Sequence, residues 1–199
     1  MVRLGAEKIA EGKVAVAMMA GGSGTRLKFE HPKGMYQPGA LPSNKSIFQL
    51  LAERFQGGER FSRMVAGDGS KNRCTWLIMT SEENHNETVE FFAANGFFGI
   101  KEQLLFFPQG MLPALDFEGK IIMENPGKIS RSGNGNGGLL EAFRVRKDIQ
   151  EMVKERGIEY MQIFGVDNIL AKFLDPLMIG AMVDTKAAAI AKVVPKRAP

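Results

Sequence analysis

Apolar and polar positions along the chain follow two alternating patterns. Short, nearly continuous apolar runs are typical of strands buried in a parallel sheet. These runs span residues 14–19, 75–80, 104–107, 160–166 and 188–194. Between them, apolar residues recur with helical spacing and predict helices over residues 46–56, 86–95, 139–145, 147–156 and 175–184. Strands that alternate with helices predict an α/β fold.

Three further segments complete this outline. Residues 1–12 form a polar helical lead-in to a single domain over residues 13–199, with Ala6, Ile9 and Ala10 on one face and Gly12 ending the helix. Residues 57–73 combine glycine and charge without a sustained period, so we expect an exposed excursion there. Residues 115–122 predict a hairpin that turns at Glu118-Gly119.

A glycine-rich turn follows the first predicted strand. Ala20-Gly21-Gly22-Ser23-Gly24-Thr25 supplies small residues where the backbone can approach a ligand closely and donate its N–H groups to phosphate oxygens. By itself this cluster fits a tight structural turn equally well. Arg26 and Lys33 follow it and could hold the same anion. Neither the P-loop motif nor G-x-G-x-x-G is present, so both of those nucleotide-binding classes fit badly.

Other polar residues stand where open α/β sheets place ligands, at the carboxyl ends of strands. Gln109 could pair with a uracil edge or could be a solvated turn residue. Asp167 could bind Mg²⁺ or could be a cap. A second glycine cluster contains Gly135 and Asn136 and opens onto a helix, which favours a phosphate or sugar site, although a disordered tip has the same composition. For His85 we expect a surface or capping role rather than metal binding.

Composition narrows the class of partner. The 199 residues suit one domain, and a net charge of +4 spread without a run argues against a nucleic-acid polymer. The single cysteine, Cys74, cannot form an intrachain disulfide. No signal peptide or long apolar span is visible, so we expect a cytoplasmic protein without a membrane partner.

Four motifs together resemble those of the UDP-N-acetylhexosamine pyrophosphorylases within the sugar-nucleotide pyrophosphorylases. The segment A-G-G-S-G-T-R-L, followed by P-K-G-M-Y at residues 32–36, matches the family signature. The segments Q-G-M-L-P-A at 109–114 and V-D-N-I-L at 166–170 match two more. The fourth is the family's P-D-G-N-G-G-L, where Asn134 replaces the aspartate and predicts weaker ligand binding if that carboxylate orders the loop.

The resemblance implies a Rossmann-like nucleotidyltransferase fold, similar to glycosyltransferase A, with a mixed sheet flanked by helices and incomplete at its C-terminal end. It implies catalytic roles for Arg26 and Lys33, a sugar contact for Asn136, and Mg²⁺ (or Mn²⁺) bound by Asp167. The implied nucleotide-binding residues are Met19, Ala20, Gly21, Gly22, Lys33, Gln109, Gly135 and Asp167.

The implied reaction joins UTP and N-acetylglucosamine 1-phosphate into UDP-N-acetylglucosamine and pyrophosphate. A UDP-glucose or broader UDP-sugar pyrophosphorylase remains an alternative, as does a catalytically inactive nucleotide-binding fragment. We read the chain as partial, because the resemblance covers less than half of a family member. If residues 188–194 form a strand at an unpaired apolar edge, we expect self-association through it.

Overall fold

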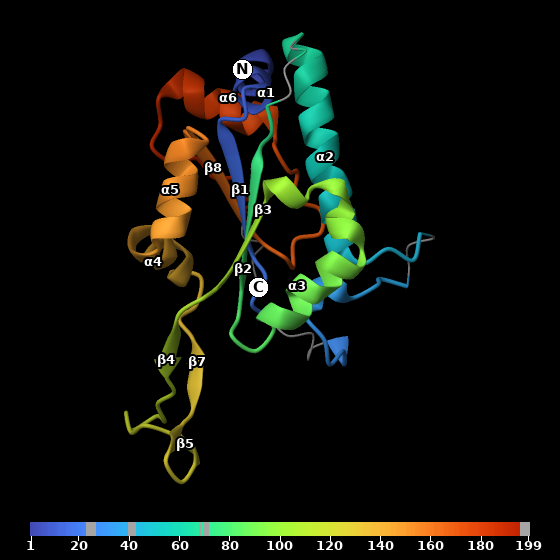
Figure 1. Cartoon of the computed structure of the whole chain (residues 1–199). Coiled ribbons are helices and arrows are strands. Elements are labelled where there is room, and N and C mark those ends of the chain that lie inside the picture. The colour runs from blue at the N-terminus through green and yellow to red at the C-terminus, as the bar shows by residue number, and fades with distance from the viewer. Residues whose placement is uncertain (23–26, 40–42, 68, 70–71, 196–199) are drawn as a thin grey trace.

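A four-stranded parallel sheet forms the centre of the computed structural model, which describes residues 1–22, 27–39, 43–67, 69 and 72–195 (Figure 1). The strand order is β3-β2-β1-β8. Their bounds are Leu104–Pro108, Thr75–Thr80, Val14–Met19 and Tyr160–Gly165, each within one residue of the sequence prediction. The α/β prediction is therefore confirmed for the sheet.

Helices cover both faces of this sheet. In Figure 1, α2 (Ile47–Ala66) and α3 (His85–Ala94) lie on one side, and α4 (Gly138–Val145) and α5 (Lys147–Glu155) lie on the other. Helices α1 (Val2–Ala10) and α6 (Pro176–Thr185) pack together at the end where β1 begins. Short 3₁₀ turns, η2 (Lys33–Met35), η3 (Gly96–Gly99) and η4 (Lys101–Gln103), occur in the connections.

Strand β1 explains why two helical layers are needed. Its alternate side chains belong to two separate apolar clusters, because successive residues of a strand point to opposite faces. Val14, Val16 and Met18 pack on the α2 and α3 side, whereas Ala15 and Ala17 pack on the α4 and α5 side. The larger cluster is centred on Trp76, whose ring is 5.7 Å from Phe55 and 5.3 Å from Phe173 between centroids. The small alanines leave room for the helices of the opposite face.

A β-arm of residues 111–133 projects away from this body (Figure 1). Two antiparallel pairs build it: β4 (Met111–Pro113) with β7 (Arg131–Gly133), and β5 (Met123–Asn125) with β6 (Lys128–Ile129). The predicted hairpin is part of this arm. Leu115 and Ile121 form its bridge, and Gly119 turns it with a φ of 81°.

Two sequence predictions about the elements are wrong. Helix α2 runs to Ala66 instead of ending at residue 56, so most of the predicted excursion is helical. The glycines at 57 and 58 suggested a break, but Gly58 lies where α2 crosses the Phe173 carbonyl, and a Cβ atom there would be 2.7 Å from that oxygen. Packing against a neighbouring segment therefore outweighs the low helix propensity of glycine.

The second wrong prediction is the final strand. Residues 188–194 are irregular and exposed and pair with no strand in the described part of the chain. The outer strands of the sheet are β3 and β8, so the apolar edge that we expected at residues 188–194 does not exist there. An apolar, β-branched run is insufficient for a strand when no neighbouring strand offers hydrogen bonds. None of the helices described here has the length and apolarity to span a membrane.

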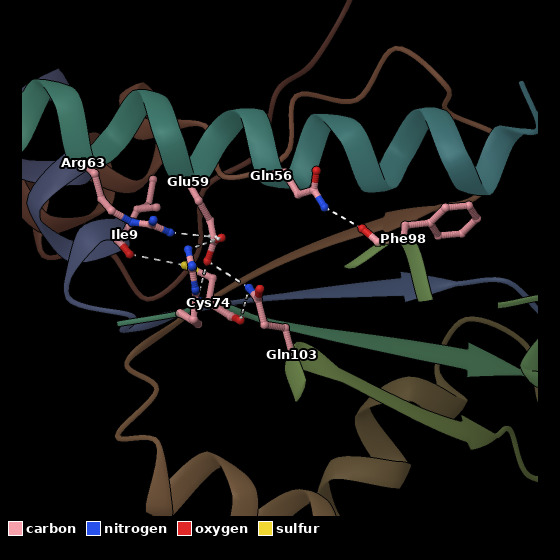
Figure 2. A network of polar contacts seen from close by, with 8 residues as sticks. Ile9, Gln56, Glu59, Arg63, Cys74, Phe98 and Gln103 are labelled. Carbon is pink, nitrogen blue, oxygen red and sulfur yellow. Dashed lines mark hydrogen bonds and ion pairs between the residues drawn. The ribbon is translucent and has the colours of Figure 1, made fainter. Parts of the chain in front are cut away.

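The amino ends of the strands are tied together by a buried carboxylate (Figure 2). Glu59 on α2 is 4% exposed, and its Oε1 accepts hydrogen bonds from the Cys74 backbone N–H (2.8 Å) and from Gln103 Nε2 (2.9 Å). Its Oε2 lies 3.1 Å from an Arg63 guanidinium nitrogen. Cys74 precedes β2 and Gln103 precedes β3, so one side chain connects helix α2 to two strands.

Candidate functional site

The loops that leave the carboxyl ends of the parallel strands begin side by side. The backbone N–H of Ala20, directly after β1, donates to the Met79 carbonyl (2.7 Å), and the N–H of Val166, directly after β8, donates to the Met19 carbonyl (3.0 Å). The extended register therefore carries the glycine loop and the Asp167 loop to the same edge of the sheet. Met19, Ala20, Gly21, Gly22 and Asp167 are brought together as the sequence predicts.

Gln109 lies against the glycine loop. Its backbone N–H donates to the Thr80 carbonyl (2.8 Å), which fixes it at the end of β3. Its carboxamide lies between two glycines: a Cβ atom would be 3.2 Å from the carboxamide at Gly21, and only 2.0 Å from Nε2 at Gly133. Residue 133 must therefore lack a side chain for this glutamine to occupy its place. The planar amide stands at the base of the arm, next to the glycine loop.

Lys33 is presented by a short, well-braced turn. Within η2 the N–H of Met35 donates to the Pro32 carbonyl (2.9 Å), and the Lys33 N–H contacts the Gly22 carbonyl at 3.4 Å. Gly34 lies against the Phe48 ring, where a Cβ atom would be 2.2 Å from the ring carbon Cζ. The Pro-Lys-Gly sequence thus fixes the lysine backbone against the core and against the glycine loop.

The Lys33 ammonium forms an ion pair with Asp167. Nζ lies 2.5 Å from Oδ1, joining the turn after β1 to the loop after β8. The two side chains differ in burial: Lys33 is 17% exposed and Asp167 is 70% exposed. Asp167 therefore presents a carboxylate to solvent while holding the lysine. The sequence places both residues in one site but does not predict their direct contact.

The second glycine cluster is anchored to the Gln109 loop. The Asn134 N–H donates to the Gly110 carbonyl (2.9 Å), and its Nδ2 donates to Glu141 Oε2 (2.9 Å) on α4. An ionised aspartate at position 134 could not donate to Glu141, so the asparagine suits this neighbour. Gly135 adopts a φ of 72°, and Asn136 is exposed on the turn into α4.

Sequence reasoning missed Asn84, which bonds to the backbone at the start of the glycine loop. Asn84 is buried, and its Nδ2 donates to the Ala20 carbonyl (3.2 Å). Its Oδ1 accepts from the Ser81 N–H (2.8 Å), and its own N–H donates to Ser81 Oγ (3.2 Å). The spacing Ser-x-x-Asn is the signal that could have found it, since serine and asparagine side chains favour local bonds to the backbone in turns.

His85 begins α3 and contacts Thr80, with Nδ1 2.7 Å from Oγ1. The helix cap is the preceding residue, Asn84, so His85 is the first residue of the helix and not its cap. Burial, and secondly the positive charge of Arg146, lower the pKa of His85 below its ordinary value. A neutral imidazole is therefore favoured beneath the Gln109 loop.

Two of the predicted functions have no direct geometric test. Arg26 lies outside the described residues, so its position relative to Lys33 stays a prediction. Among the described residues, no group of three or more acidic, histidine or cysteine side chains is arranged to hold a metal ion. Asp167 alone fits Mg²⁺ only where phosphate oxygens and water complete the coordination, which is the common arrangement for this ion.

The glycine loop, the lysine turn and the strand-end carboxylate lie at the carboxyl edge of a parallel sheet, which is where open α/β domains bind their ligands. The family model described as UTP–glucose-1-phosphate uridylyltransferase matches residues 4–199, and the chain belongs to this family.

Relatives agree with the motif-based resemblance. The chain is 41% identical to UDP-N-acetylglucosamine diphosphorylase 2 of Arabidopsis thaliana over 99% of its own length and 40% of that protein. The structure of UDP-N-acetylglucosamine pyrophosphorylase from Trypanosoma brucei, in complex with an inhibitor, superposes with a TM-score of 0.86 at 36% identity. That match covers 94% of this chain and 38% of the trypanosomal one.

A further solved structure, a putative UDP-N-acetylglucosamine pyrophosphorylase from Entamoeba histolytica, gives a TM-score of 0.83 at 41% identity, over 93% of this chain and 46% of that one. These likenesses confirm the predicted nucleotidyltransferase fold class. The chain spans about two fifths of the length of the first relatives it matches.

Proposed function

We propose that this chain provides the UTP-binding part of a uridylyltransferase that forms UDP-N-acetylglucosamine and pyrophosphate from UTP and N-acetylglucosamine 1-phosphate. One observation carries the proposal: Gln109, Gly21, Gly22, Lys33 and Asp167 form an unbroken series of contacts along the carboxyl edge of the sheet. The order of these groups matches that of a nucleotide. The Gln109 amide at one end can bind a base, and the charged groups at the other end can bind phosphates. The names of the relatives, which are UDP-N-acetylglucosamine diphosphorylases or pyrophosphorylases, support N-acetylglucosamine as the sugar.

The proposed reaction needs positioning and charge neutralisation more than a protein nucleophile. An oxygen of the sugar phosphate attacks the α-phosphorus of UTP in line, and pyrophosphate leaves. Lys33, together with Arg26, offsets the negative charge that develops on the leaving group. Gln109 pairs with the uracil edge, while the backbone of Gly21 and Gly22, next to Met19 and Ala20, holds the uridine.

The remaining roles follow from position. Asp167 holds Mg²⁺ (or Mn²⁺), which neutralises phosphate charge when bound. Asn136 contacts the sugar, and Gly135 permits the backbone turn that places it there, since glycine adopts positive φ without a steric penalty. UDP-glucose remains the alternative product class, because the family model carries a glucose-1-phosphate description. Nucleotide binding without turnover is the second alternative, given the two-fifths coverage of the relatives.

Calorimetric titration with UTP and with ATP tests the nucleotide assignment. We expect a clear preference for UTP, because a uracil edge matches the donor and acceptor of one carboxamide. Gln109→Ala should weaken UTP binding by about 1–3 kcal/mol, the effect of leaving buried polar groups unpaired. It should leave ATP binding nearly unchanged.

Gln49→Ala is the matched control, since this glutamine is on α2 and its side chain bonds only to Glu53 among the described residues. Its UTP affinity should equal that of the parent chain. Equal affinity of the parent for ATP and UTP would contradict the proposal. Formation of UDP-N-acetylglucosamine, followed with radiolabelled UTP against glucose 1-phosphate as competing substrate, then separates the sugar alternatives.

A further inference from the structure

The ion pair between Lys33 and Asp167 joins the phosphate-binding cation to the metal-binding anion of the proposed site. Each group therefore neutralises the other before any ligand arrives. Lys33 is mostly buried, and its turn is held by the Gly22 carbonyl and by Gly34 against the Phe48 ring, so the lysine backbone has a fixed place beside the glycine loop. Asp167 is largely exposed and lies open to a cation from solvent.

Other charges nearby do not replace this arrangement. His31, on the same turn, pairs with Glu87 of α3 at 2.5 Å, so that carboxylate has its own partner. Glu82, on the loop after β2, pairs with Arg131 of the arm at 3.3 Å. Within the described part of the chain, Asp167 is the acidic side chain that lies within ion-pair distance of Lys33.

We propose that the Lys33–Asp167 pair makes this site select metal-complexed polyphosphates over metal-free ones. A metal-free triphosphate must displace Asp167 from Lys33 and is then repelled by the released carboxylate. A metal-complexed triphosphate brings its own cation to Asp167 and so frees Lys33 for the phosphate oxygens. This inference rests on the proposed function and adds to it a specificity role that neither residue has alone.

Asp167→Asn should change the affinity for metal-free UTP and for metal-complexed UTP in opposite directions. With the divalent ions removed by EDTA, Asp167→Asn releases Lys33 and should tighten UTP binding about two- to fivefold, the range that a partly exposed ion pair contributes. In excess Mg²⁺ the same variant loses the carboxylate that holds the ion and should bind UTP more weakly than the parent. Lys33→Met should weaken binding in both conditions.

The experiment is calorimetric titration of UTP into the 199-residue chain and its variants, once in EDTA and once in excess Mg²⁺. The double variant Lys33→Met with Asp167→Asn distinguishes the ion pair from a general effect of charge. If Asp167 acts through Lys33, the tightening in EDTA disappears in the Lys33→Met background. Lys33→Gln serves as a second lysine variant if Lys33→Met does not fold, as judged by circular dichroism.

Glu82→Gln is the matched control, because it also removes one exposed carboxylate from this end of the sheet. It should change UTP affinity by less than Asp167→Asn in EDTA. Three results overturn the inference while leaving the proposed function in place: no tightening by Asp167→Asn in EDTA, the same tightening in the Lys33→Met background, or equal tightening by Glu82→Gln. Absence of UTP binding by the parent chain in Mg²⁺ overturns both.

Discussion

The two ends of the parallel sheet each carry a carboxylate that pairs with a basic side chain, but the pairs differ in burial and in number of partners. At the amino end, Glu59 is 4% exposed and accepts hydrogen bonds from Cys74 and Gln103 as well as pairing with Arg63 (Figure 2). At the carboxyl end, Asp167 is 70% exposed and pairs with Lys33. A buried charge with several partners holds elements together, whereas an exposed charge with one partner can exchange it for a ligand.

This difference has an energetic basis. Removing one member of a buried, hydrogen-bonded pair leaves the others uncompensated in a low-dielectric interior and is strongly destabilising. Separating a pair in which one member is largely exposed costs less, because water solvates the exposed charge. The amino end should therefore determine stability, and the carboxyl end should determine binding. Each of the following substitutions tests one side of this division.

The largest expected effect is at Glu59. Glu59→Ala removes the charge partner of Arg63 and Arg73, the acceptor of the Cys74 N–H and one of the two acceptors of the Gln103 amide, so we expect the free energy of unfolding to fall by about 3–5 kcal/mol. Urea denaturation monitored by circular dichroism measures it. Glu53→Ala is the control on the same helix, because its exposed pair with Lys45 should contribute less than about 1 kcal/mol. Similar losses for the two variants would contradict the division between the two ends.

A smaller effect is expected at Gly34, where the lysine turn packs against the core residue Phe48. Gly34→Ala places a methyl group against the Phe48 ring, and over-packing of this kind typically costs about 1–3 kcal/mol of stability. Because the lysine turn must shift, UTP affinity should fall as well. Gly39→Ala, where no atom lies within 4 Å of the added Cβ, should change neither quantity. Reduced stability with unchanged UTP binding would show that the turn does not position Lys33.

The outcome of the sequence predictions follows the same division. Strands 14–19 and 75–80 were predictable because nearly all of their side chains are buried and most are apolar, so local pattern and tertiary environment agree. The extension of α2 past Gly57 and Gly58 was not predictable, because it depends on a close approach by the distant Phe173 carbonyl. The strand predicted at residues 188–194 is wrong for the opposite reason: their pattern suits a strand, but within the described ranges no strand pairs with them.

The site was predictable in its composition and not in its contacts. Gln109, Lys33 and Asp167 could be placed at one edge, because parallel strands end there. The Lys33–Asp167 pair joins residues 134 positions apart and leaves no local signal. Asn84 had such a signal in its spacing from Ser81, yet its contact with Ala20 again depends on the arrangement of β1 beside β2.

The smallest expected effect is on the pH dependence of folding stability, through His85 at the carboxyl end of the sheet. Burial, and then Arg146, lower the pKa of His85 in the folded chain, whereas the unfolded chain keeps a value near about 6.5. Below that pH the unfolded state binds more protons than the folded state, so stability is fully present above about pH 6.5 and decreases as the pH falls through the lower folded value. Because the ring is only half-buried, we expect a loss of a few tenths of a kcal/mol.

Urea denaturation at pH 7.5 and pH 5.5 measures this loss, and His85→Gln isolates it from the titration of carboxylates. The parent should lose slightly more stability between the two pH values than His85→Gln does. His31→Gln removes the other histidine, which is exposed and pairs with Glu87, and it controls for the loss of any imidazole. A parent and a His85→Gln variant with the same pH dependence would mean that proton binding at His85 is not linked to folding.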